Sequence, residues 1–134
     1  MINIKSKIND NLLMSIINID SLSNKNNFIS SEQDPLQIGF FNFEKSYKVQ
    51  THKHVDNIKK TTKTNEAWFI IDGIFEVESL DFNQETIYKK QFTKNNLIIY
   101  YAGYHSIKAI SKMNKLLEFR NGPYLGRENE TVKL

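Results

Sequence analysis

Most of the chain after residue 35 alternates between apolar and polar side chains, with the period of two that is typical of β-strands. Stretches rich in Ile, Val, Phe and Tyr are separated by short turns containing Asn, Asp or Gly. No stretch has a convincing 3.6-residue helical period, so the pattern predicts an all-β sandwich or closed barrel. The predicted strands are 36–43, 47–54, 66–71, 74–80, 86–92, 97–101, 104–110 and 115–120.

The first 35 residues have a different pattern. Residues 12–18 form a short apolar run flanked by Asn, Asp and Ser, which predicts a buried strand rather than a helix. Residues 19–35 predict a loop that ends at Pro35. We therefore expect residues 1–35 to pack on the barrel or at a dimer edge, and residues 36–134 to form the barrel.

Turn residues and side-chain parity add detail to this expectation. Asp72-Gly73 lies between two β-branched and aromatic runs, which predicts a hairpin, and 94–96 and 102–103 predict further turns. Both faces of 66–71 are largely apolar, so this strand is expected to be covered on both sides. Glu66 shares a face with Trp68 and Ile70, because side chains alternate along a strand.

Composition narrows the class of protein. At 134 residues, with 40% hydrophobic residues and a net charge of +3, the chain has the size and composition of one globular domain. The lysines are scattered, and the cluster at residues 59, 60 and 63 is better explained by a solvated loop, so no nucleic-acid partner is predicted. With no cysteine, no apolar membrane span and no secretion signal, we expect a cytoplasmic protein without disulfides or a membrane partner.

The three histidines are the candidate metal ligands. His52 and His54 are two residues apart on a predicted strand, so both imidazoles point the same way, and His105 follows a glycine turn. With Glu66 they would make a three-nitrogen, one-oxygen set for one divalent transition metal ion: Fe, Mn, Ni, Co, Cu or Zn. His-x-His alone is a weak signal, which a surface or hydrogen-bonded pair explains better than a metal site does.

The spacing around these residues resembles the two motifs of the cupin superfamily. His52-Lys53-His54, then Glu66 and Gly73, is similar to the first motif, with a longer insert than usual. Gly103-Tyr104-His105 is similar to the second motif, without its usual proline. The resemblance implies a double-stranded β-helix, or jelly-roll barrel, in which His52, His54, Glu66 and His105 bind the metal.

Residues 36–133 resemble more closely a group of small bacterial cupin-fold metalloproteins that carry a C-terminal Gly-Pro-Tyr, here Gly122-Pro123-Tyr124. Some of those proteins are associated with gene clusters for surface-polysaccharide biosynthesis, and no reaction is established for them. Where they have an Arg in the insert, this chain has Lys59, which replaces a guanidinium fork with a point charge.

Three residues beside the ligands are candidates for substrate binding. Trp68 would wall the pocket or fill barrel volume, Tyr104 would supply a hydroxyl, and Lys59 would hold an anionic group at the mouth. Glu118 and Arg120 would form either a pair in the lumen or an exposed cross-strand pair. No catalytic residue can be assigned from the sequence.

Two classes of function remain open at this point. The first is a metal-dependent enzyme that acts on a small polar metabolite, such as a sugar derivative or a carboxylated compound. The second is a non-catalytic module that binds or senses a small ligand, because this architecture is used by both classes. The resemblance also implies a homodimer.

Overall fold

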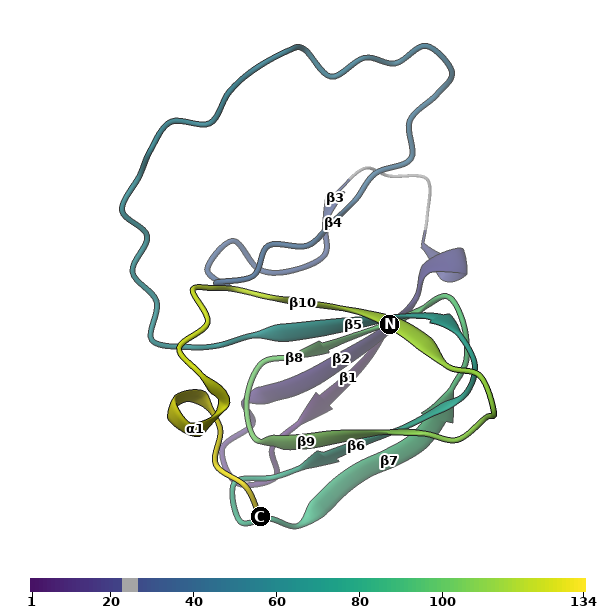
Figure 1. Cartoon of the computed structure of the whole chain (residues 1–134), viewed down its shortest axis with the longest axis vertical. Coiled ribbons are helices and arrows are strands. Elements are labelled where there is room, and N and C mark those ends of the chain that lie inside the picture. The colour runs from purple at the N-terminus through teal and green to yellow at the C-terminus, as the bar shows by residue number, and fades with distance from the viewer. Residues whose placement is uncertain (23–26) are drawn as a thin grey trace.

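The structure is a computed structural model that describes residues 1–22 and 27–134. It is an all-β molecule in which two antiparallel sheets pack face to face (Figure 1). The larger sheet has the strand order β1-β2-β8-β5-β10, formed by Ile2–Lys5, Leu12–Asn18, Asn96–Tyr100, Glu66–Asp72 and Lys115–Arg120. The smaller sheet has the order β7-β6-β9, formed by Thr86–Phe92, Phe75–Leu80 and Tyr104–Ala109.

Short elements flank the two sheets. A 3-10 turn, η1, covers Ile19–Ser21, and β3 (Asn27–Phe28) pairs with β4 (Gly39–Phe40) in a small ribbon. A single-turn helix, α1, covers Arg127–Glu130 near the C-terminus. None of the helices in the described ranges has the length and apolar character needed to cross a membrane.

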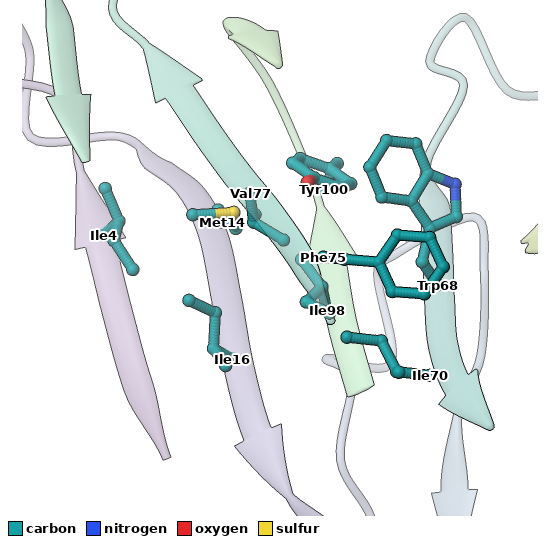
Figure 2. Packing of buried hydrophobic residues seen from close by; sticks show 9 residues of the cluster. All are labelled: Ile4, Met14, Ile16, Trp68, Ile70, Phe75, Val77, Ile98 and Tyr100. Carbon is teal, nitrogen blue, oxygen red and sulfur yellow. The ribbon is translucent and has the colours of Figure 1, made fainter. Parts of the chain in front are cut away.

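Two apolar clusters hold the sheets in place. The first lies between the sheets, where side chains from both layers interdigitate (Figure 2). The second lies on the outer face of the larger sheet, where side chains of the segment 29–38 cover it. The strand β5 is therefore covered on both faces, as the sequence predicts. The first cluster contains Ile4, Met14, Ile16, Trp68, Ile70, Phe75, Val77, Ile98 and Tyr100.

The six predicted strands from 66–71 to 115–120 are confirmed to within one or two residues at their ends. The strand predicted at 12–18 is also confirmed, and β2 lies inside the larger sheet between β1 and β8. The predicted loop 19–35 contains η1 and β3, and its residues 23–26 lie outside the described part of the chain.

The hairpin predicted at Asp72-Gly73 is wrong. β5 pairs with β8 and β10, whereas β6 pairs with β7 and β9, so this turn carries the chain from one sheet to the other. Gly73 has a φ of +90°, and a Cβ built on it would lie 2.5 Å from the carbonyl oxygen of Met113. The glycine is required because the corner has a left-handed conformation and presses against a neighbouring loop.

Of the other two predicted strands, one is confirmed only in part and one is wrong. Only Gly39–Phe40 of the predicted strand 36–43 is paired, and the predicted strand 47–54 has no strand pairing at all. Residues 41–65, which we call the arm, leave the sandwich as a long excursion and return at the start of β5 (Figure 1). Among the described strands β9 pairs only with β6, so its other edge lacks a strand partner.

Candidate functional site

Glu66 and His105 meet at one end of the sandwich, although they come from different sheets. Glu66 is the first residue of β5, and His105 is the second residue of β9. The His105 Nε2 atom lies 3.1 Å from Glu66 Oε2, and both side chains are partly exposed, at 29% and 18%. This end of the sandwich therefore presents an imidazole and a carboxylate to solvent in direct contact.

Strand register explains why polar groups gather here. In the larger sheet Glu66 lies between Tyr100 on β8 and Arg120 on β10. In the smaller sheet Ser79 on β6 lies beside His105. Residues paired across neighbouring strands share a face of their sheet, so each sheet contributes one row of side chains here. The contact between Glu66 and His105 shows that the two rows face each other across the end of the sandwich.

The start of β5 is fixed by a side chain from the C-terminal segment. The Asn121 Oδ1 atom accepts the backbone N–H of Asn65 at 2.8 Å, and Asn121 Nδ2 donates to the carbonyl oxygen of Lys63 at 3.0 Å. Asn121 thereby holds the chain just before Glu66, which sets the direction in which Glu66 enters the site.

Aromatic rings form the floor below His105. The His105 ring stacks on Tyr100 with centroids 4.0 Å apart and an interplanar angle of 25°. Trp68 meets the Tyr100 ring edge-on at 4.7 Å and the His105 ring at 5.7 Å. Figure 2 shows Trp68 and Tyr100 at one end of the inter-sheet core. The stacking fixes the plane of the imidazole and leaves its Nε2 edge toward Glu66.

The charges around Glu66 favour its ionised form. The hydrogen bond with His105 lowers the pKa of the Glu66 carboxyl, burial opposes this, and the charges of His105 and Arg120 lower it further. Arg120 Nη1 lies 3.8 Å from Glu66 Oε1. Burial and the neighbouring Glu66 carboxylate raise the pKa of Tyr100, so its phenol keeps its proton. The Tyr100 hydroxyl is buried without a hydrogen-bond partner among the described residues.

His52 and His54, the other two predicted metal ligands, lie in the exposed arm. Their rings are 5.3 Å apart, and His52 Nδ1 contacts the carbonyl oxygen of Gln50 at 2.8 Å. The described residues contain no group of three or more His, Cys, Asp or Glu side chains that is arranged to hold a metal ion. The structure thus brings Glu66 and His105 together, and the four-ligand set does not converge in this arrangement.

The predicted substrate-binding residues are in three different places. Trp68 lies in the inter-sheet core with its ring against His105, and it is 7% exposed. Tyr104 pairs in register with Leu80 and therefore lies on the opposite face of β9 from His105. Lys59 lies exposed in the arm. Only Trp68 is close to the contact between Glu66 and His105.

Two residues at the site were not found by sequence reasoning. The first is Tyr100, which is followed directly by a second tyrosine, Tyr101. Neighbouring residues of a strand point to opposite faces, so only one of the two can face the site, and only the pairing of Glu66 with Tyr100 shows that it is Tyr100. Glu130 reaches the site from α1 and forms an ion pair with Arg120. No sequence pattern links a residue of the C-terminal tail to β10. Glu118, the expected neighbour of Arg120, is exposed.

Comparison of the chain with protein-family models, with curated proteins and with solved structures finds no significant match. The resemblance to cupins therefore depends on the motif residues alone.

Proposed function

We propose that the chain is a metal-binding jelly-roll protein of the cupin type, and that it acts as a metal-dependent enzyme on a small polar metabolite. Its metal ligands would be His52, His54, Glu66 and His105. The contact of 3.1 Å between Glu66 and His105 is the observation that carries the proposal. A carboxylate and an imidazole, held together at the open end of a β-sandwich, are two donors of the kind that first-row transition metals prefer.

The open edge of β9 supports a way to complete the set. His105 lies on this strand, whose outer edge has no strand partner in the described part of the chain. An unpaired edge readily accepts a further strand, because its backbone N–H and C=O groups are unsatisfied. Addition of 47–54 would give the smaller sheet a fourth strand, as the predicted jelly roll requires.

The arm has the side-chain pattern that such a strand needs. His52 and His54 share one face, while Tyr47, Val49 and Val55 share the other. These three apolar side chains are 52–71% exposed in the arm. A register that turns both histidines toward His105 places the apolar residues on the outer face of the sheet.

Each group would have a separate task in the assembled site. The bound metal would supply Lewis acidity toward an oxygen of the metabolite. Glu66 and His105 would fix its position, since the stacked Tyr100 ring holds the imidazole plane and Arg120 holds the carboxylate. Trp68 would wall the adjacent volume.

The test is metal binding by the purified, metal-stripped protein. We expect one equivalent of Zn²⁺ or Mn²⁺ by calorimetry and elemental analysis, and an affinity at least about tenfold lower in Glu66→Gln, His105→Ala and the double variant His52→Ala/His54→Ala. Glu118→Gln is the matched control, because Glu118 is an exposed carboxylate on β10. Absence of binding, or equal binding by all variants, would refute the proposal.

The metabolite class is tested on the metal-loaded protein. Nucleotide sugars and keto acids are screened by thermal shift, followed by product analysis for each compound that stabilises the protein. A stabilising ligand that is recovered unchanged would contradict the enzymatic part of the proposal and leave the metal site intact.

A further inference from the structure

Arg120 reaches the site from β10 and carries more hydrogen-bonding capacity than its neighbours use. One branch of the guanidinium, Nη1, lies 3.8 Å from Glu66, and the other, Nη2, pairs with Glu130. Its Nε atom is buried without a hydrogen-bond partner among the described residues. A guanidinium has five N–H donors in a planar fork that matches a carboxylate, so Arg120 has the geometry of a carboxylate receptor.

Glu130 occupies this receptor from outside the sandwich. It belongs to α1 in the C-terminal tail, yet its side chain is only 9% exposed. Its Oε1 atom accepts the backbone N–H of Leu125 at 2.7 Å, and its Oε2 atom faces Arg120. Burial of a carboxylate is costly unless charge and hydrogen bonds compensate for it; here the Arg120 guanidinium supplies the charge and the Leu125 N–H supplies one hydrogen bond.

Tyr124 completes the corner. The centre of the Arg120 guanidinium lies 4.5 Å from the centroid of the Tyr124 ring, which keeps the guanidinium plane in place by a cation–π contact. The receptor is therefore made by Arg120 at the end of β10 and by the segment that follows it directly. Glu130 lies further along the C-terminal tail, in α1.

We propose that Arg120, Tyr124 and the backbone N–H of Leu125 form a carboxylate-binding subsite beside Glu66 and His105, and that Glu130 is its internal occupant until a small carboxylic acid displaces it. The inference rests on the proposed function in one respect, since a carboxylate bound here places the rest of a short acid next to Glu66 and His105. It assigns to Arg120 the anion-binding task that sequence reasoning assigned to Lys59.

Displacement has a measurable consequence. If Glu130 and an external carboxylate compete for Arg120, the apparent affinity for the acid is reduced by the fraction of molecules in which Glu130 is bound. Removal of the Glu130 charge should remove this competition. The acid should bind more tightly after this loss of a negative charge, whereas a neutral analogue should bind no better.

Trp68 provides the signal for the titration. It is the single tryptophan of the chain, and its ring lies 5.7 Å from His105. Malonate and pyruvate are titrated into metal-free protein, with malonamide as the uncharged control, and Trp68 fluorescence is recorded. The metal-free protein is used so that the result does not depend on the proposed metal site.

In Glu130→Gln we expect the Kd for malonate to fall by about tenfold. Glu128→Gln is the matched control, because Glu128 is an exposed carboxylate of the same helix, and it should change the Kd by less than about twofold. Arg120→Gln, with folding checked by circular dichroism, should abolish binding in both the wild-type and Glu130→Gln backgrounds.

Three results would overturn the inference: an unchanged Kd in Glu130→Gln, an equal gain in Glu128→Gln, or equal binding of malonate and malonamide. If Arg120→Gln does not fold, Arg120→Lys decides the point, because it keeps the charge and loses the fork, and an unchanged affinity there would contradict a guanidinium receptor. Loss of metal binding with intact malonate binding would refute the proposed function alone.

Discussion

At the scale of single residues, Asp81 is the side chain that connects the N-terminal strand to the smaller sheet. It follows β6, is 2% exposed, and accepts hydrogen bonds from the Ser6 hydroxyl at 2.7 Å and the Lys7 N–H at 2.8 Å. Burial raises the pKa of its carboxyl, but the hydrogen bonds from Ser6 and from the backbone N–H of Phe82 and Lys7 outweigh burial and lower it. The ionised form of Asp81 is thus the one that the fold stabilises.

We predict that Asp81→Asn lowers the melting temperature most at neutral pH. Because the folded-state pKa of Asp81 is below its ordinary value of 3.8, its contribution to stability is present above that pH. The contribution disappears as the pH falls through the folded-state pKa. Thermal unfolding of both proteins at pH 7 and at about pH 3 should show a difference of several degrees that shrinks in acid.

Asp10→Asn is the control for this experiment. Asp10 pairs with Lys5 at the surface and its side chain is 81% exposed, so its replacement should have little effect at either pH. If the difference between wild type and Asp81→Asn stays the same at both pH values, the ionised carboxylate is not what holds the N-terminal strand.

At the scale of elements, the sequence predicts where strands lie better than how they connect. Alternation of apolar and polar side chains is a local property, so β5 to β10 were found within one or two residues. Pairing is not local. Asp72-Gly73 has the composition of a hairpin, but its left-handed glycine serves equally well at a corner between sheets, and the position of Met113 beside it cannot be derived from nearby sequence. The strand propensity of 47–54 likewise does not supply a partner strand.

The strand β2 lies inside the larger sheet, between β1 and β8. This position removes one reason for expecting a dimer interface at the N-terminus. The apolar composition of the run 12–17 predicts that it needs a partner chain or the barrel edge to cover it. Within one chain β1, β8 and both apolar clusters already cover it. A homodimer stays a prediction of the cupin resemblance, to be measured by light scattering, and this run does not require one.

We therefore predict that substitutions in β2 act on folding. Ile17 is completely buried in the outer cluster, so Ile17→Ala should lower the free energy of unfolding by about 2–5 kcal/mol in urea denaturation. Ile2→Ala on β1 is the control, because Ile2 is 47% exposed, and it should change this free energy by no more than about 0.5 kcal/mol. A small effect of Ile17→Ala would show that β2 is dispensable for the sandwich.

At the scale of the whole molecule, the candidate site consists of a part that the sequence reveals and a part that only the fold reveals. Motif spacing pointed to Glu66 and His105, and the two sheets do place them in contact, while metal ligation stays a prediction. Tyr100 and Glu130 could not be identified, because their positions depend on strand register and on the path of the tail. Distance along the chain says nothing about either of these.

The arm is the part of the molecule whose position decides between the observed arrangement and a closed metal site. Its trypsin sites lie on exposed backbone without strand pairing, whereas the sandwich is held by two apolar clusters. We predict that trypsin cuts the metal-free protein first within the arm, which mass spectrometry of the fragments identifies. These sites are Lys45, Lys48, Lys53, Lys59, Lys60 and Lys63.

Addition of Zn²⁺ should slow cleavage at Lys48 and Lys53 several-fold, because a strand paired to β9 presents its backbone poorly to a protease. Cleavage at Lys112, in an exposed turn at the other end of the sandwich, reports the general rate and should stay constant. In His52→Ala/His54→Ala, Zn²⁺ should give no protection. If wild-type protein binds the metal while cleavage of the arm is unchanged, Glu66 and His105 bind it without the arm, and the four-ligand site has to be abandoned even though a metal site remains.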